Sequence, residues 1–335
     1  MLDVNNFGIL KKYLTEKDII EPNSPVLIQS LPGGVSNSVL KISCDRGQFV
    51  LKQALPKLKV TSEWVSDVAR SNVEKQALKF LYGIIPGTTP ALLYEDENNY
   101  LFIMECVPES SVTWKSLLLK QDCNASLAKK VGEILGRLHQ NTHDLQEARE
   151  LFGNKKYFYQ LRIEPFFEFL KCKYPDLTMD IDRHIANCLE RECSIVIGDY
   201  SPKNILVCDE QIVVIDFEVI HYGDSSFDLG FLTTHLLLKS LNAWEFRDSY
   251  YDILQATVDG YFSCIQFAKR ADLEQQCVQQ LAWILLARVD GKSPIAYISK
   301  EKDKQLIRYA SRELLNNNMT TYKEVIEFFN LKMKQ

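Results

Sequence analysis

The spacing of hydrophobic and polar residues divides the chain into a strand-rich first part and a helix-rich second part. Before residue 107, short apolar or alternating runs bounded by turn residues predict five strands. They are Val26–Leu31, Ser38–Ser43, Gln48–Gln53, Ala91–Tyr94 and Tyr100–Cys106. One stretch there, Trp64–Leu81, has helical spacing and ends before Gly83 and Pro86. The pattern predicts a small antiparallel sheet with one helix inserted after the third strand.

From residue 111 onward the spacing is mainly helical. The segments Ser126–His139, Tyr157–Leu170 and Asp180–Arg191 are predicted helices, and long helices resume at Phe227. Two short apolar runs between residues 197 and 216 interrupt the helices and predict a pair of strands. We therefore predict an α+β fold with an N-terminal lobe at 1–107 and a larger, mainly helical C-terminal lobe at 108–335.

The composition is that of an ordinary globular protein. The 335 residues, enough for two lobes, are 46% hydrophobic and 25% charged, with a formal net charge of −5. Neither half is basic, so no nucleic-acid partner is expected. No apolar run approaches the roughly 18–20 residues of a membrane span and no signal peptide is visible, which favours a cytoplasmic protein without a membrane partner. The nine cysteines lack C-x-x-C spacing and are expected to be buried apolar residues. The pattern predicts no particular oligomeric state.

The most informative segment is Ile197–Asp216, which reads IGDYSPKNILVCDEQIVVID. It places Asp199 on a predicted loop, Asn204 at the start of a strand and Asp216 at the end of the next strand. This is the D-x-x-x-x-N plus Asp arrangement of kinase catalytic and metal-binding loops. Phosphoryl transfer needs a carboxylate facing the acceptor hydroxyl and oxygen ligands that hold Mg²⁺ on the ATP phosphates. The spacing predicts Asp199 as the catalytic base and Asn204 and Asp216 as Mg²⁺ ligands.

Two charged residues upstream, a lysine and a glutamate, are spaced as a phosphate-binding lysine and the acid that holds it. Lys52 ends the predicted strand FVLK, where a lysine can pair with the α- and β-phosphates, and Glu74 lies in the following helix, where it can hold that lysine. Taken singly, each is more often a solvated surface residue. Their order before the catalytic segment favours the functional interpretation.

The loop between the first two strands is a second candidate for phosphate contact. Adjacent glycines, Gly33 and Gly34, allow backbone amides to approach phosphates closely, and Ser36 and Asn37 follow them. The alternative is a simple hairpin turn. We include all four residues in the predicted nucleotide site because the loop precedes Lys52.

The segment after Asp216 separates small-molecule kinases from protein kinases. It reads FEVIHYGDSSFDLG, and helical spacing resumes at Phe227, so no room remains for an activation segment ending in A-P-E. The acceptor is therefore predicted to be the hydroxyl group of a small molecule; the less favoured alternative is a protein kinase that acts on an unusual partner. Lys203 is predicted to contact the transferring phosphoryl group, as a cation beside developing negative charge; the alternative is a solvated loop lysine.

These motifs resemble the aminoglycoside phosphotransferase superfamily, which includes choline kinases and methylthioribose kinases. The resemblance rests on VIGDYSPKNILV, on VIDFEVIHYGDSSFDLG and on GEILGRLH at Gly132–His139. The segment KQALP, which begins at Lys52, looks like the methylthioribose kinase branch. The resemblance implies a bilobal protein-kinase-like fold with ATP bound between the lobes, and acceptors such as a sugar like methylthioribose, an amino alcohol or an aminoglycoside-like compound.

The resemblance also assigns residues. Met104, Glu105 and Cys106 match the hinge, where backbone groups would bind adenine, and Asp228 matches a position that braces the catalytic loop.

Three positions leave alternatives open. Ile197 stands where many relatives have a histidine that supports the loop, so a nucleotide-binding scaffold without catalysis is a rival hypothesis. Arg288 resembles an arginine that methylthioribose kinases use on their sugar, and is otherwise an ion-pair partner of Asp290 or another acid. Glu218 either contacts the substrate or packs beside the metal-binding loop.

Overall fold

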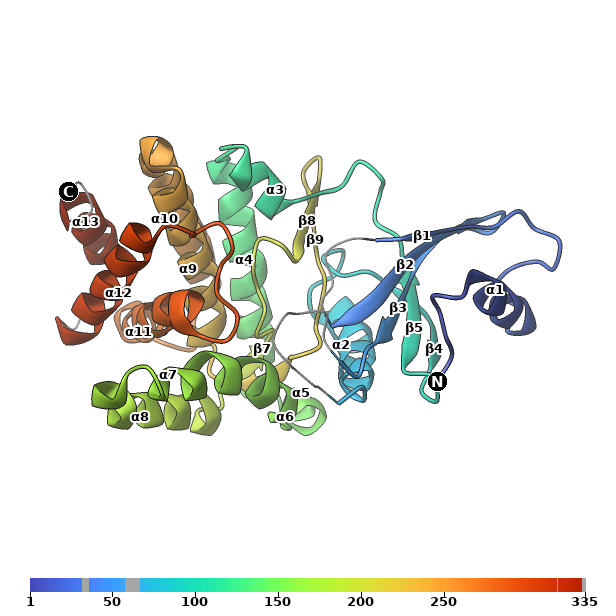
Figure 1. The fold of residues 1–335 in the computed structure, drawn as a ribbon, viewed down its shortest axis with the longest axis horizontal. Helices are drawn as coiled ribbons and strands as arrows, with labels where there is room; N and C mark the ends of the chain where they lie inside the picture. The colour runs from blue at the N-terminus through green and yellow to red at the C-terminus, as the bar shows by residue number, and fades with distance from the viewer. Residues whose placement is uncertain (32–35, 58–66, 318, 333–335) are drawn as a thin grey trace. The chain divides into compact units, whose positions relative to one another are not determined.

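The computed structural model describes residues 1–31, 36–57, 67–317 and 319–332 (Figure 1). The chain forms two compact units, Met1–Ser110 and Ser111–Gln335, which divide close to the boundary predicted after Val107. The predicted α+β class is confirmed, with a small antiparallel sheet in the first unit and a mainly helical second unit.

The first unit contains all five predicted strands. They pair in the order β1-β2-β3-β5-β4, and every neighbouring pair is antiparallel. The strands are β1 (Leu27–Ser30), β2 (Asn37–Cys44), β3 (Gly47–Ala54), β4 (Leu92–Asp96) and β5 (Leu101–Glu105). The register sets Lys52 of β3 opposite Phe102 of β5, so the lysine lies on a central strand rather than at an edge.

Helices cover both faces of this sheet (Figure 1). Because side chains alternate across a strand, Leu51 enters the core beneath α1 (Phe7–Glu16), whereas Lys52 faces α2 (Arg70–Ile84). The predicted start of the second helix, at Trp64, lies outside the described residues. Helix α1 adds a second helix to the single one predicted, although its buried residues Leu10, Tyr13 and Leu14 follow the three- and four-residue spacing of a helix.

The predicted strand pair of the second unit is present and belongs to a small sheet. Strand β8 (Ile205–Cys208) pairs with β9 (Gln211–Val214) on one side and with β6 (Val112–Thr113) on the other. Two further short strands, β7 (Ser194–Val196) and β10 (His221–Gly223), pair with each other.

Helices form the remainder of the second unit. The segment predicted as one helix at Tyr157–Leu170 is instead α6, a π-helix η1 and α7, because Pro165 has no N–H for an ordinary helical hydrogen bond. The bounds are α3 (Trp114–Leu119), α4 (Ala125–Thr142), α5 (Gln146–Phe152), α6 (Lys156–Phe158), η1 (Tyr159–Glu168), α7 (Phe169–Lys171), η2 (Pro175–Leu177), α8 (Thr178–Glu190), α9 (Ser226–Asn242), η3 (Trp244–Phe246), α10 (Arg247–Cys264), α11 (Arg270–Asp290), α12 (Glu301–Asn316) and α13 (Tyr322–Lys332).

Helices α4 and α10 approach each other closely because glycines line their contact. A Cβ on Gly132 of α4 would lie 2.0 Å from the carbonyl oxygen of Thr257, and one on Gly260 of α10 would lie 2.2 Å from the carbonyl oxygen of Lys129. Only glycine leaves room for backbones at this separation. The close packing fixes the direction of α4, which carries His139.

The structure corrects the expectation for most of the cysteines. Of the nine free cysteines, only Cys188 and Cys277 are buried, so the expectation of buried apolar thiols is wrong for the others. Across residues 1–31, 36–57, 67–317 and 319–332, none of the helices combines the length and apolar character that crossing a membrane requires.

Candidate active site

A buried carboxylate holds the loop that carries Asp199. Asp228, in the first turn of α9, is fully buried and accepts hydrogen bonds from the backbone N–H groups of Ile197 (2.7 Å) and Gly198 (2.8 Å). Gly198 has a φ of +73°, and a Cβ there would lie 3.0 Å from Val219 Cγ2. Glycine alone adopts this turn without strain. Because Asp199 follows directly, its position depends on the Asp228 carboxylate.

A buried histidine extends this network. His139 Nε2 lies 3.4 Å from Asp228 Oδ2, and His139 Nδ1 lies 2.9 Å from the Tyr261 hydroxyl. The partners assign the tautomer: Tyr261 donates to Nδ1, and the Nε2–H points at the carboxylate. The Ile197 side chain is buried in the core, and this residue reaches Asp228 through its backbone. The brace on the loop therefore needs no imidazole at position 197.

Two cations converge on the Asp199 carboxylate. Asp199 Oδ2 lies 2.8 Å from Lys203 Nζ and 3.0 Å from a guanidinium nitrogen of Arg162, while Oδ1 accepts the Ser201 hydroxyl at 3.3 Å. Asp199 is only 5% exposed, so these groups take the place of water around it. Lys203, which was predicted beside the transferring phosphoryl group, thus contacts the proposed base directly. Arg162 was not predicted, because it comes from a distant helix and no local motif marks it.

The irregular helix η1 presents Arg162 to the loop. The Arg162 guanidinium also donates to the Gly198 carbonyl at 2.6 Å, and it lies 5.8 Å and 5.7 Å from the ring centres of Phe166 and Phe231. A π-helix changes the angular spacing of side chains, and such segments are common at functional sites. The carbonyl, the carboxylate and the two rings together fix the plane of the guanidinium.

The β8–β9 hairpin places the two predicted metal ligands side by side. Asn204 precedes β8, Asp216 follows β9, and Ile215 N–H donates to the Asn204 carbonyl at 3.0 Å. The Asn204 side-chain nitrogen donates to the Asp199 carbonyl at 3.1 Å, which leaves the amide oxygen as the atom that a cation can use. The described residues contain no group of three or more His, Cys, Asp or Glu side chains that suits a metal ion. A cation here would draw its other ligands from phosphate and water.

Lys52 and Glu74 form a buried ion pair in the first unit. Lys52 Nζ lies 2.7 Å from Glu74 Oε1, and the two residues are 5% and 2% exposed. The alternative that both are solvated surface residues is therefore wrong. Burying a pair of charges costs hydration and contributes little net stability, so a pair at this position suggests a role beyond stability.

The described part of the predicted phosphate loop is held by side-chain hydrogen bonds. Gly33 and Gly34 lie outside the described residues. Ser36 and Asn37 are buried at the start of β2, and the Asn37 amide donates to the Ser36 hydroxyl at 2.9 Å. Arg70, fully buried in the first turn of α2, donates to the Ser36 carbonyl. Sequence reasoning missed Arg70, which looks like an ordinary helix-face arginine.

The predicted hinge residues differ in their backbone environment. Met104 and Glu105 belong to β5, where Met104 is paired with both Val50 of β3 and Leu92 of β4. Cys106 is the first residue after the strand, and burial raises the pKa of its thiol. Of the three predicted residues, Cys106 is therefore the one whose backbone lies beyond the strand pairing.

The two predicted substrate contacts are both placed in the second unit. Arg288 lies in the last turn of α11 and donates to the Ser293 carbonyl at 2.7 Å. The alternative that Arg288 pairs with Asp290 is wrong, because Asp290 binds Arg308 at 2.7 and 2.8 Å. Glu218 is 9% exposed in the loop between β9 and β10.

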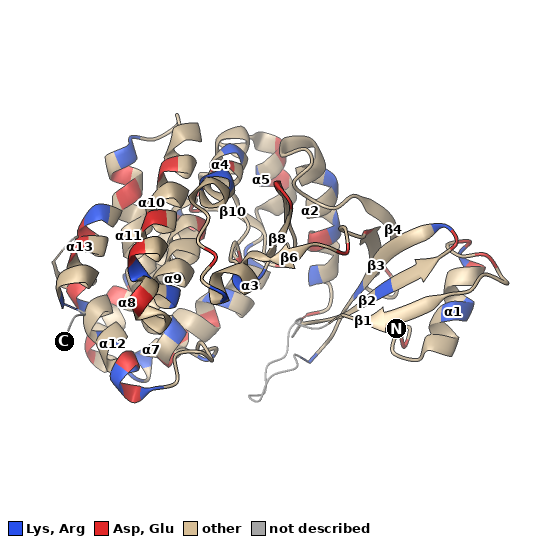
Figure 2. Ribbon diagram, turned by 90° about the horizontal axis from the view of Figure 1, so that it is seen from above, with Lys and Arg blue, Asp and Glu red and all other residues tan. Residues whose placement is uncertain are grey.

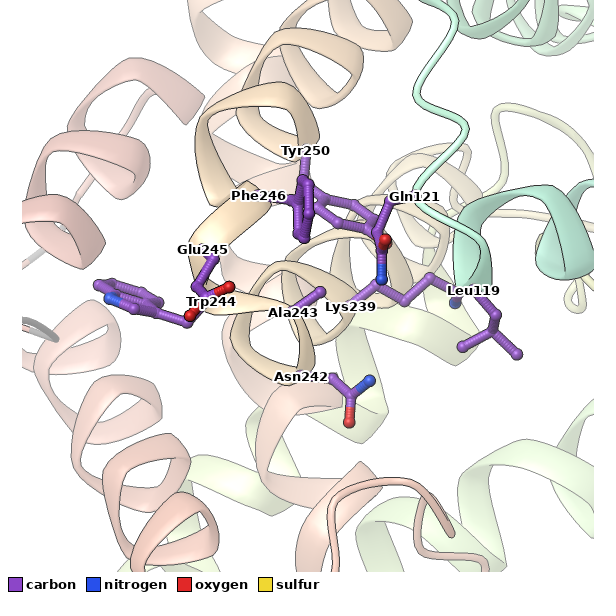
Figure 3. Close-up of a pocket in the computed structure, with 9 residues that line it drawn as sticks. All are labelled: Leu119, Gln121, Lys239, Asn242, Ala243, Trp244, Glu245, Phe246 and Tyr250. Carbon is purple, nitrogen blue, oxygen red and sulfur yellow. The ribbon is translucent and has the colours of Figure 1, made fainter.

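The second unit also contains a cavity of about 270 Å³ at the end of α9 (Figure 3). Lys239 is one of its lining residues, and Asp199 is not. The others are Leu119, Gln121, Asn242, Ala243, Trp244, Glu245, Phe246 and Tyr250. The proposed base therefore does not line this cavity.

Comparison with known proteins gives consistent matches. The phosphotransferase enzyme family matches residues 27–261. Methylthioribose kinase of Bacillus cereus (strain G9842) is 25% identical over 264 residues, which are 71% of this chain and 67% of that relative, so the chain spans about two thirds of its length. Among solved structures, Plasmodium vivax ethanolamine kinase superposes with a TM-score of 0.60 and 14% identity, over 94% of this chain and 90% of that one. An amicoumacin kinase in complex with AMP-PNP, Ca²⁺ and Ami has a TM-score of 0.58 and 13% identity, over 94% and 96%. The structural likenesses establish a shared fold.

Proposed function

The chain belongs to the phosphotransferase enzyme family and is a small-molecule kinase, and from this premise we propose that it transfers the γ-phosphate of ATP to a hydroxyl group with Asp199 as the base. The observation that carries the proposal is the Asp199 loop, held by Asp228 beside a hairpin that joins Asn204 to Asp216. By their names, the matched proteins act on methylthioribose, ethanolamine and amicoumacin. Sugars, amino alcohols and aminoglycoside-like compounds are therefore the acceptors to consider.

The donor set fits ATP with a divalent cation. The amide oxygen of Asn204 and the carboxylate of Asp216 are hard oxygen ligands, and Mg²⁺ typically combines one or two such groups with substrate phosphates. Lys52, held by Glu74, is the cation expected on the α- and β-phosphates. One structural neighbour carries AMP-PNP and Ca²⁺. We infer that Mg²⁺ is the ion used, and its contribution when bound is to neutralise charge on the phosphates.

The residues around Asp199 then divide the chemical work. Asp199 orients the acceptor hydroxyl and accepts its proton as the oxygen attacks phosphorus. Lys203 is 48% exposed at its side chain, so it can turn from Asp199 towards the transferring phosphoryl group and stabilise its charge. Arg162 keeps its hold on the Gly198 carbonyl and so preserves the loop as the proton moves.

Measuring ADP release by an Asp199→Asn variant tests this proposal. Turnover with Mg·ATP and an acceptor should fall by at least about 1,000-fold, while ATP affinity changes little. Asp209→Asn, in the exposed turn of the same hairpin, is the matched control and should retain turnover. Wild-type turnover by Asp199→Asn would refute the assignment. Mg·ATP binding without turnover on any acceptor would instead favour a nucleotide-binding scaffold.

A further inference from the structure

Cationic side chains surround the Asp199 carboxylate. Lys203 and Arg162 touch the carboxylate, and Arg288 lies close enough to Asp199 and Arg162 for both charges to act on it. Arg162 and Arg288 also share one aromatic ring, with guanidinium carbons 5.8 Å and 5.5 Å from the centre of Phe166. Two guanidinium groups on the same ring cannot be far apart.

Lys239 of α9 lies next to this group of cations. His235 packs edge-on against Phe231, the other ring that Arg162 contacts, at a centroid distance of 5.0 Å. Lys239, one turn later, is 2% exposed, donates to the His235 carbonyl at 3.3 Å and lies 5.4 Å from the ring centre of Tyr297.

The charges with the largest effects on His235 and Lys239 are cationic. Burial lowers the pKa of His235 well below its usual value, and Lys239, Arg288, Lys203 and Lys115 lower it further. Burial likewise lowers the pKa of Lys239 to about 7, with Lys115 and Arg288 adding to the effect.

Apart from Asp199, these cations have no acidic partner among the residues that the structure describes. Asp199 is the single carboxylate within ion-pair distance of Arg162 and Lys203, and none lies so close to Arg288 or Lys239 in the part of the chain that the structure describes. Elsewhere in the second unit, Figure 2 shows Lys and Arg interleaved with Asp and Glu along the helices.

Two polar atoms in the same region are buried without a hydrogen-bond partner. They are Arg288 Nε and the Tyr297 hydroxyl. Leaving a buried donor unsatisfied is unfavourable, and more so when the group is charged. Both donors would be satisfied by an oxygen-rich group with negative charge, since a guanidinium binds carboxylate and phosphate in the plane of its N–H groups.

We propose that the acceptor alcohol carries an anionic group, a carboxylate or a phosphate, which binds Arg288, Lys239 and Tyr297 while its hydroxyl lies at Asp199. This inference rests on the proposed kinase function and names its substrate class. A cationic acceptor such as an amino alcohol or an aminoglycoside would meet the like charges of Arg162, Lys203 and Arg288. Repulsion by these groups therefore disfavours such acceptors.

Acceptors matched in shape but not in charge test the proposal. ADP release by the full chain with Mg·ATP is measured for gluconate against glucose, glycerate against glycerol, and ribose 5-phosphate against ribose, with choline and ethanolamine as cations. At least one acid should exceed its neutral counterpart in kcat/KM by about 10-fold or more, the effect expected of one charge-assisted contact. The carboxylates and the phosphate ester distinguish the two kinds of anion.

Variants locate the effect. Arg288→Met and Lys239→Met should each raise KM for the preferred acid by about 10-fold or more, with a smaller effect on kcat and little effect on the neutral counterpart. Arg288→Lys keeps the charge and should restore part of the affinity. Arg312→Met, which removes a surface arginine paired with Asp176, is the control and should leave KM unchanged.

The panel of acceptors need not include the natural one, so binding of the same compounds and of inorganic phosphate is also measured by calorimetry. Acids that bind to wild type but not to Arg288→Met support the proposal even without turnover. Turnover or tighter binding of a neutral or cationic counterpart would refute the proposal that the acceptor is an anion. Acids that bind no better than their neutral counterparts would refute it too. Either result would leave the proposed kinase function in place. Failure of the proposed function is separate, because it appears as loss of Mg·ATP binding or of any dependence on Asp199.

Discussion

Replacing Asp228 with asparagine removes the charge that holds the catalytic loop while changing the shape of the side chain very little. The carboxylate is fully buried and accepts the N–H groups of Ile197 and Gly198 at 2.7 and 2.8 Å. In the variant one of the two oxygens becomes an NH₂ group that points at a backbone donor. One charge-assisted bond is lost and one buried N–H is left unsatisfied.

The magnitude follows from these two losses. A hydrogen bond to a charged group contributes about 1.5–3 kcal/mol, and a stranded buried donor costs about 1–3 kcal/mol, which together give about 4 kcal/mol. For a unit of this size, that loss lowers the melting temperature by about 10 °C. Because the same change releases the turn before Asp199, turnover should also fall by at least about 100-fold.

Differential scanning calorimetry and ADP release measure both effects on the same preparation. Asp259→Asn is the control, since Asp259 forms an exposed pair with Arg270 at 2.9 Å and such pairs contribute little. A melting temperature within about 2 °C of wild type for Asp228→Asn, with unchanged turnover, would refute the argument that this carboxylate charge positions the loop.

Three further predictions concern packing, acid and the buried ion pair. Gly132→Ala should destabilise the protein by at least about 2 kcal/mol through backbone overlap, whereas Gly83→Ala, which meets no atom within 4 Å, should stabilise it slightly; thermal melting of the two would contradict this if they shifted alike. Burial lowers the pKa of His184 to about 3, so His184 stays neutral in the folded state, whereas in the unfolded chain it gains a proton below its usual pKa of 6.5. The free energy of unfolding should therefore fall by about 2 kcal/mol from pH 7 to pH 5 in urea titrations. His184→Gln should remove this part of the pH dependence. Lys52→Met should cost about 3–5 kcal/mol because it removes the cation paired with the buried Glu74 carboxylate. The double variant with Glu74→Leu should regain stability but not ATP affinity, and recovery of both would argue against a phosphate contact.

The parts of the site that lie in one stretch of sequence could be predicted from it. Asp199, Asn204 and Asp216 follow a spacing that a loop and a hairpin impose locally, and the predicted pairing of β8 with β9 puts Asn204 and Asp216 at the same end of the hairpin. The five strands of the first unit were equally accessible, because turns and alternation are local signals.

The groups that surround Asp199 from other helices could not be predicted in the same way. Arg162 reaches it from a π-helix that contains Pro165, and no periodicity rule anticipates a π-helix there. His139 and Tyr261 meet through tertiary packing alone. Arg288 was found by resemblance, but its lack of an acidic partner is visible only once the neighbours of Asp290 are known.

The glycine contact between α4 and α10 also has a consequence for folding during synthesis. Gly132 meets Thr257, and His139 meets Tyr261, across more than 120 residues of chain. On a ribosome, α4 and the loop of Asp199 emerge well before the helix that orients them. The nascent chain thus carries every proposed reacting group of the second unit before it can align them. Phosphoryl transfer should begin only after α10, which supplies none of those groups, has been synthesised and docked.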